Sequence, residues 1–125
     1  MAITKDVGRQ YPLVATVLFD FADIPAQATY EAIDLPGNAL VTGGVLEVIT
    51  VDAGGGTVAV KIGSVVLLAA TASTPASRTF ITETDVATAA PDTVDVAVAT
   101  ANLTTGAYRL TIEYILIGRA NEVNP

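Results

Sequence analysis

The sequence predicts an all-β protein, a single antiparallel β-sandwich of about eight strands, for which jelly-roll and Ig-like topologies are both open. Three observations predict this class. Apolar and polar residues alternate with a period of two along several segments, as they do in strands with one buried face. Val, Ile, Thr, Tyr and Phe, which suit a pleated surface, are the residues enriched in these segments. Short turn sequences rich in Gly, Pro, Asn and Asp separate them at sandwich-like spacing.

The clearest strands are those in which every second residue is apolar: 12–21, 57–62, 93–100 and 108–116. Shorter strands are expected at 28–35, 44–51, 64–69 and 78–84, between turn sequences such as LPGNA and DAGGG. One helix-tolerant stretch, ETDVATAAPD, is limited to a turn or two by its threonines and by Pro91.

The length of 125 residues fits one domain, which we expect to span residues 11–117. Residues 1–10 and 118–125 do not have strand patterning, and we name them an N-terminal arm and a C-terminal tail. They are either frayed ends, as termini commonly are, or segments that contact neighbouring chains. Their charged and amide side chains, together with the first aromatic residue of the domain, are the candidate contacts: Lys5, Arg9, Gln10, Tyr11, Arg119, Asn121 and Glu122.

The three consecutive glycines in VDAGGGTVAVKIG raise the question of a phosphate-binding loop. Such a loop needs Lys and Ser or Thr directly after its last glycine, followed by a helix whose N-terminus faces the anion. Here Thr57 follows Gly56 and the next residues alternate as a strand. We therefore interpret residues 52–56 as a corner in which glycine supplies backbone conformations with positive φ.

Composition argues against most chemistry. The chain has no His and no Cys, which excludes a Ser–His pair and thiolate chemistry and removes the usual zinc ligands. Its acidic residues have ordinary interpretations, since Asp52, Asp85 and Asp92 fall at turns, where Asp accepts backbone hydrogen bonds. We predict no catalytic, metal or cofactor site, and no enzymatic activity. With a net charge of −7 and six scattered basic residues, neither nucleic acid nor an anionic membrane is an expected partner.

The segment SVVLLAA, residues 64–70, is apolar on both faces. It is either a central strand covered on both sides or a strand at a subunit interface, and Leu67 is the candidate interface residue of the second interpretation. Substituting Leu67 by Asp separates the two, because only the first predicts loss of folding.

Two stretches resemble small structural proteins of tailed bacteriophages. DLPGNALVTGGVLEVITVDAGGGTVAVKIG resembles their pattern of an LP-G-LVTGG motif, a strand, an acidic Gly-rich turn and a strand ending in IG. YRLTIEYILIGRANEV resembles their last strand and tail. Together the stretches cover about half of the chain.

The resemblance implies a non-enzymatic β-sandwich carried on the virion. Its leading form is a capsid decoration (cement) protein, made in the host cytoplasm, that binds the major capsid protein on the outer shell, commonly as a trimer. A tail, neck or head-fibre protein is the alternative of the same class. A carbohydrate-binding module is a further alternative, and its aromatic platform would rest on Tyr11 and Tyr30.

Overall fold

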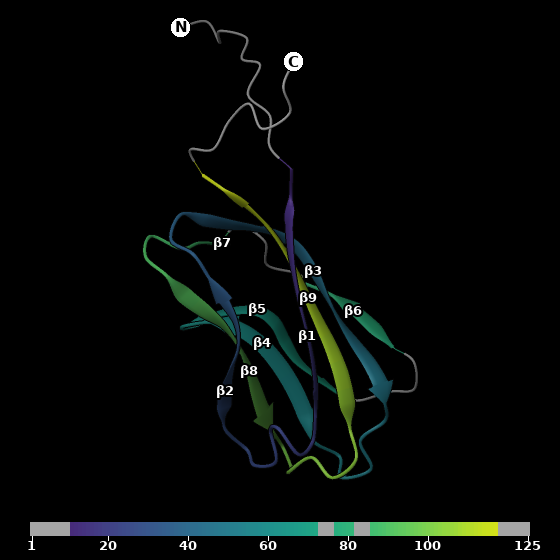
Figure 1. The fold of residues 1–125 in the computed structure, drawn as a ribbon. Helices are drawn as coiled ribbons and strands as arrows, with labels where there is room; N and C mark the ends of the chain where they lie inside the picture. The colour runs from purple at the N-terminus through teal and green to yellow at the C-terminus, as the bar shows by residue number, and fades with distance from the viewer. Residues whose placement is uncertain (1–10, 73–76, 82–85, 118–125) are drawn as a thin grey trace, which may run out of the picture.

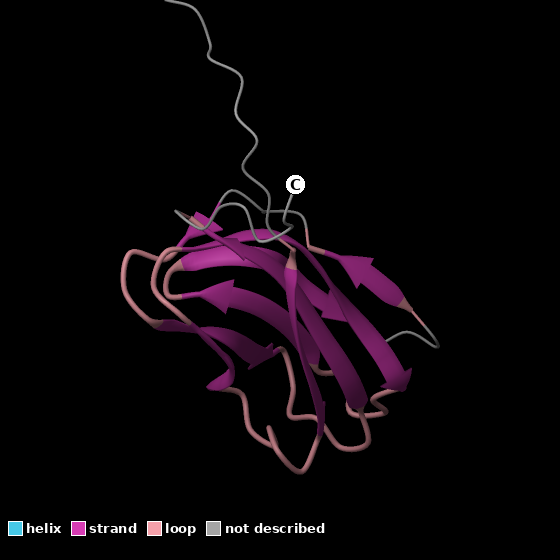
Figure 2. Ribbon diagram, turned by 45° about the horizontal axis from the view of Figure 1, so that its top comes forward, coloured by secondary structure: helices cyan, strands magenta, loops and turns pink. Residues whose placement is uncertain are grey.

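The structure, a computed structural model, describes residues 11–72, 77–81 and 86–117, and this part of the chain consists of strands and loops without a helix (Figures 1 and 2). Nine strands are present there: β1 (Leu13–Asp20), β2 (Thr29–Leu35), β3 (Ala39–Thr50), β4 (Thr57–Ile62), β5 (Val65–Ala72), β6 (Arg78–Phe80), β7 (Val86–Ala87), β8 (Asp92–Ala99) and β9 (Ala107–Leu116).

The strands form two antiparallel sheets. The first, which we call sheet A, has the order β1-β9-β3-β6, with the two-residue β7 also paired to β3. The second, sheet B, has the order β2-β8-β4-β5. Figure 1 shows β1, β9 and β3 of sheet A in front of β8, β4 and β5 of sheet B. The predicted all-β sandwich is confirmed.

The pairings also decide the topology. β4 pairs with β5, β3 with β6, β2 with β8 and β1 with β9, so the chain is one long hairpin with four strand pairs along it. Successive pairs alternate between sheets B and A, and β3·β9 and β4·β8 contacts close each sheet. A long hairpin rolled up in this way is a jelly roll.

The core lies between the two sheets and is built by the period-two alternation predicted from the sequence. Sheet A contributes Tyr108, Leu110 and Ile112 of β9, and sheet B contributes alternate valines of β4 and β8. The fully buried large side chains are Tyr108, Leu35, Leu46, Leu67, Leu110, Ile112, Val41, Val58, Val60, Val94 and Val96. Phe19 and Tyr108, opposite each other on β1 and β9, stack with ring centroids 5.3 Å apart.

β3 differs from its predicted extent, because it begins at Ala39 rather than at residue 44. The part of β3 before residue 44 contains an irregularity, where the register with β9 shifts between Val41 and Gly43. At Gly44 a Cβ atom would lie 2.6 Å from the carbonyl oxygen of Thr111 on the neighbouring strand. Glycine therefore permits the close approach of β3 and β9 while the strand continues.

β5 also differs from the first interpretation of its sequence, because it is an edge strand of sheet B and not a central one. Its two leucines are nevertheless both buried, whereas Val65 and Val66 are exposed. The register with β4 shifts twice, and Leu67 is the extra residue between the pairs Val60–Leu68 and Lys61–Val66. This bulge turns the adjacent Leu67 and Leu68 into the core together.

Candidate interaction surfaces

Asp52 lies in the glycine-rich connection between β3 and β4, and only 6% of its surface is exposed. Its carboxylate accepts backbone hydrogen bonds at 2.7–3.3 Å from Gly56 within its own loop and from Thr104, Thr105 and Gly106 before β9. One side chain therefore joins the β3–β4 connection to the β8–β9 connection. The sequence predicted a turn Asp but could not predict that three of its donors lie more than fifty residues away.

Burial of the Asp52 carboxyl raises its pKa, and the hydrogen bonds from Thr105, Thr104, Gly56 and Gly106 outweigh that effect and lower the pKa to about 2. The charged form is thus favoured by its amide donors. Because the Gly56 N–H is donated to Asp52, the glycine-rich loop forms an internal clamp. The connection also passes from sheet A to sheet B, so the predicted corner is a crossover between sheets and not a hairpin.

Both carboxylate oxygens of Asp52 accept backbone hydrogen bonds from the two connections that it joins. Within residues 11–72, 77–81 and 86–117, no three His, Cys, Asp or Glu side chains gather so as to hold a metal ion. In the same ranges, no helix is long and apolar enough to cross a membrane. The candidate contact surfaces of the described residues are the outer faces and the edges of the two sheets.

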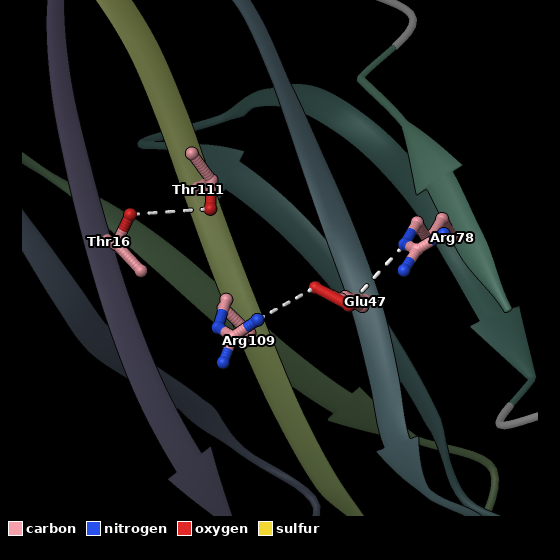
Figure 3. A network of polar contacts seen from close by, with 5 residues as sticks. All are labelled: Thr16, Glu47, Arg78, Arg109 and Thr111. Atoms are coloured by element: carbon pink, nitrogen blue, oxygen red, sulfur yellow. Dashed lines mark hydrogen bonds and ion pairs between the residues drawn. The ribbon is translucent and has the colours of Figure 1, made fainter. Parts of the chain in front are cut away.

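The outer face of sheet A carries a polar band across four strands, β1, β9, β3 and β6 (Figure 3). Glu47 of β3 lies between two arginines, 3.4 Å from Nε of Arg78 on β6 and 3.3 Å from a terminal nitrogen of Arg109 on β9. Thr16 of β1 and Thr111 of β9 place their hydroxyls 3.4 Å apart. The band follows the register, since Arg78, Glu47 and Arg109 are direct cross-strand neighbours.

Large apolar side chains flank this band and point to solvent. They are Val14, Leu18, Ile49 and Phe80, of which Phe80 is 72% exposed. Phe80 lies opposite the half-buried Val45, and Leu18 lies opposite Arg109. The outer face of sheet A therefore combines apolar groups with paired charges, a composition typical of protein–protein contact surfaces.

The outer face of sheet B has a different chemistry. Thr and Ala occupy most of its outward positions on β4 and β8, and the Ala59–Ala97 pair lies at its middle. Its charges are mainly acidic, with Glu31 opposite Asp95 and Asp95 opposite Lys61. This face carries smaller side chains than the outer face of sheet A and lacks its exposed large apolar groups on β4 and β8.

A groove of about 370 Å³ lies between β1, the loop after it and β2, where the two sheets meet at their edges. Its lining is mainly apolar, and Phe19, Ile24 and Val96 bring it to the core. Asp23 and Glu31 are its charged lining residues.

Of the predicted interface residues, two lie in the described part of the chain. Tyr11, next to the start of β1, is 62% exposed. Leu67 is fully buried within its own subunit, although its strand is an edge strand and not the central strand of the first interpretation. The others, Lys5, Arg9, Gln10, Arg119, Asn121 and Glu122, lie outside the described residues.

The two tyrosines of the carbohydrate hypothesis have unlike settings. Tyr30 is half-buried and packs against the core, and its hydroxyl bonds the backbone N–H and carbonyl of Ala26, so it closes the β1–β2 loop. Tyr11 is exposed at the opposite end of β1 from that loop. No shared aromatic platform is formed by the two.

No family model matches the sequence, and no curated protein matches it. Solved structures do match the fold. A chain in the capsid of Ralstonia phage GP4 superposes with a TM-score of 0.65 and 24% identity, covering 93% of this chain and 90% of that one. A chain in the acidic stable capsid structure of Helicobacter pylori bacteriophage KHP30 superposes with a TM-score of 0.64 and 20% identity. This match covers 86% of the present chain and 89% of the phage chain.

A third match is a chain in the capsid asymmetric unit of cyanophage Pam1, with a TM-score of 0.58, 20% identity and coverage of 93% and 92%. The three similarities extend over nearly the whole of each chain. The jelly roll described above is thus a fold shared with chains found in the capsids of three phages.

Proposed function

We propose that this protein is a non-enzymatic structural component of a bacteriophage virion. The observation that carries the proposal is the shared fold, which extends over 86–93% of the chain in three capsid structures from phages of different hosts. A fold alone does not define a function. Here the surface chemistry and the sequence resemblance to phage structural proteins point in the same direction.

Within that class, we propose a capsid decoration protein that binds the major capsid protein on the outer shell and bridges its subunits, as a homo-oligomer that is most simply a trimer. A bridging protein needs rigidity and surfaces suited to burial. The Asp52 clamp and the closed core supply rigidity, and the apolar residues around the Glu47 band supply area for burial. Binding to an assembled shell then stabilises that shell by linkage.

The test uses capsids of the phage that encodes the chain, assembled without it. Purified protein should co-sediment with these capsids at a fixed number of copies per particle and raise the temperature at which they release DNA or disassemble. Absence of binding to both immature and mature capsids, with binding to isolated tails or necks instead, would assign the protein to the alternative location and overturn the decoration role.

A matched pair of variants identifies the contacting face. Phe80→Asp and Val66→Asp each place one carboxylate at an exposed apolar position, the first on the outer face of sheet A and the second on the edge strand of sheet B. We expect Phe80→Asp to lower capsid occupancy and Val66→Asp to leave it unchanged, because only the first lies beside the apolar and ion-paired surface. Equal occupancy for both variants excludes the outer face of sheet A as the contact.

A further inference from the structure

The outward edge of β1 is the least protected strand edge in the described part of the chain. β1 pairs with β9 on one side and with no described strand on the other. Its eight consecutive pairs with β9 contain no register shift, and Asp20, at its end, is its sole charged residue. Soluble proteins normally protect such edges with bulges, charges, proline or shortness, because an open edge can accept another strand.

The three other sheet edges have such protection. β5 contains two register shifts. β2 contains one shift and carries Glu31 and Asp34. β6 has three residues, and Arg78 is the first of them. By contrast, the edge of β1 is regular and carries no charged residue before Asp20, so it is suited to accept another strand.

The hydrogen-bonding groups at this edge can be assigned from the ladder. Phe21 donates its N–H to the Gly106 carbonyl at 2.8 Å, which places odd-numbered residues of β1 in bonded pairs with β9. The N–H and C=O groups of Val14, Thr16 and Leu18 consequently point away from the sheet. The next outward N–H, that of Asp20, is capped by Oδ2 of Asp23 at 3.0 Å, so the open edge ends there.

The groove between β1 and β2 runs beside this edge. Val17, Leu18 and Phe19 form its β1 wall, and Tyr30 and Ala32 are among the residues of the opposite wall. A strand added to β1 would direct alternate side chains toward this groove, where Asp23 and Glu31 favour basic groups.

Residues 1–10, MAITKDVGRQ, do not alternate as a strand with one buried face, but they supply both apolar and basic side chains, the two kinds that this groove suits. In an extended strand Ile3, Lys5, Val7 and Arg9 fall on one face, so two apolar and two basic side chains would alternate toward the groove. The ten residues reach about 33 Å when extended, which is more than the open edge requires. We propose that residues 1–10 of one copy add a strand to the free edge of β1 in a second copy, with Lys5 and Arg9 facing Asp23 and Glu31.

Donation to a second copy is favoured over folding back within one chain. Residues 1–10 could reach their own β1 only by reversing direction near Tyr11 and Pro12. Pro12 fixes a negative φ and forces the residue before it toward an extended conformation, whereas tight hairpin turns need positive φ. A tight reversal at Tyr11 and Pro12 is therefore disfavoured.

The first experiment measures self-association of the full-length chain by sedimentation at increasing concentration, without capsids, so it is independent of the virion role. Lys5→Glu combined with Arg9→Glu should weaken association by about tenfold. Glu31→Lys should weaken it similarly, and the three substitutions together should restore part of the loss. Asp34→Lys, on the same strand but outside the groove, is the matched control and should leave association unchanged.

The second experiment tests the edge itself. Thr16→Pro removes an outward N–H that β9 does not use, so the sandwich should stay folded by circular dichroism while association is lost. In the unmodified chain the amides of Val14, Thr16 and Leu18 should exchange slowly with solvent, and in the arm variant they should exchange fast.

Three results would overturn the proposal. The first is a monomer at every concentration, whether its β1 amides are protected by its own arm or not. The second is an oligomer that neither the charge reversals nor Thr16→Pro affects. The third is an oligomer lost in Thr16→Pro but insensitive to the arm substitutions, which would mean that another strand occupies the edge.

Discussion

β1 and β5 are both edge strands of similar length and apolar composition, yet their edges differ. β1 keeps an unbroken eight-pair register with β9, and its outward backbone groups from Val14 to Leu18 are aligned for another strand. β5 shifts register twice against β4, and its bulge places Leu67 and Leu68 together in the core. Apolar composition alone therefore does not decide whether a strand edge can accept another strand. The regularity of its hydrogen-bond ladder decides it.

The largest expected effect is on the free energy of unfolding, when the buried position of the β5 bulge is substituted. Leu67→Asp places a carboxylate in a fully buried position and should lower the free energy of unfolding by more than about 4 kcal/mol, enough to unfold many domains of this size. Val66, one residue earlier, is half-exposed and lies opposite Lys61. Val66→Asp should therefore change the free energy of unfolding by less than about 1 kcal/mol. Urea titrations of both variants measure the difference.

A folded Leu67→Asp monomer that no longer associates would instead place Leu67 at a subunit interface, and the bulge would then not be what closes this edge. That outcome would also remove the contrast between β5 and β1.

The β5 segment shows the limit of what the sequence alone could predict about the fold. Alternation predicted β1, β4, β8 and β9 well, because each has one buried face and a polar or exposed opposite face. In β5 the alternation is absent, and the sequence left a covered central strand and an interface strand as alternatives. A bulge moves a residue from one face to the other, and its position depends on pairing with β4, which no local pattern records.

The same limit applies to the Asp52 clamp, which holds Gly106 in place beside the C-terminal end of β1. Gly106 donates to Asp52 and accepts from Phe21, so the clamp connects directly to the end of the β1–β9 ladder. The sequence predicts a turn Asp, but the donors from residues 104–106 are brought to it only by the closed sandwich. Tertiary structure, not local sequence, makes this carboxylate important.

An intermediate effect is expected from titrating the clamp. The pKa of Asp52 is lowered from 3.8 to about 2 on folding, so its contribution is complete above pH of about 4 and is lost as the pH falls toward 2. The contribution is about 2 kcal/mol, as a shift of this size implies. Asp52→Asn should therefore lower the free energy of unfolding by about 2 kcal/mol at pH 7. The difference in stability between the variant and the unmodified protein should become smaller as the pH falls toward 2.

Urea unfolding at pH 7, 4, 3 and 2 follows this difference, and Asp34→Asn, an exposed acid on β2, is the control. If the two proteins differ equally at all four pH values, the clamp does not act through the charge of Asp52. If the clamp also sets the end of β1, exchange of the Phe21 amide should accelerate in the variant while β5 amides remain unchanged.

The smallest effect is expected on the outer face of sheet A, where Glu47 bridges Arg78 and Arg109 beside β1. Both arginines are largely exposed, and ion pairs of this kind contribute little, so Glu47→Gln should lower the free energy of unfolding by less than about 1 kcal/mol. The loss should disappear in about 1 M salt, where screening acts within about 3 Å. Asp34→Asn removes one negative charge from the edge strand of sheet B, outside the groove, and provides the reference for thermal unfolding at both salt concentrations. A loss above about 2 kcal/mol that persists in salt would mean that the band holds β9 and β3 in register, and the regular edge of β1 would then depend on side chains of the outer face as well as on its own backbone ladder.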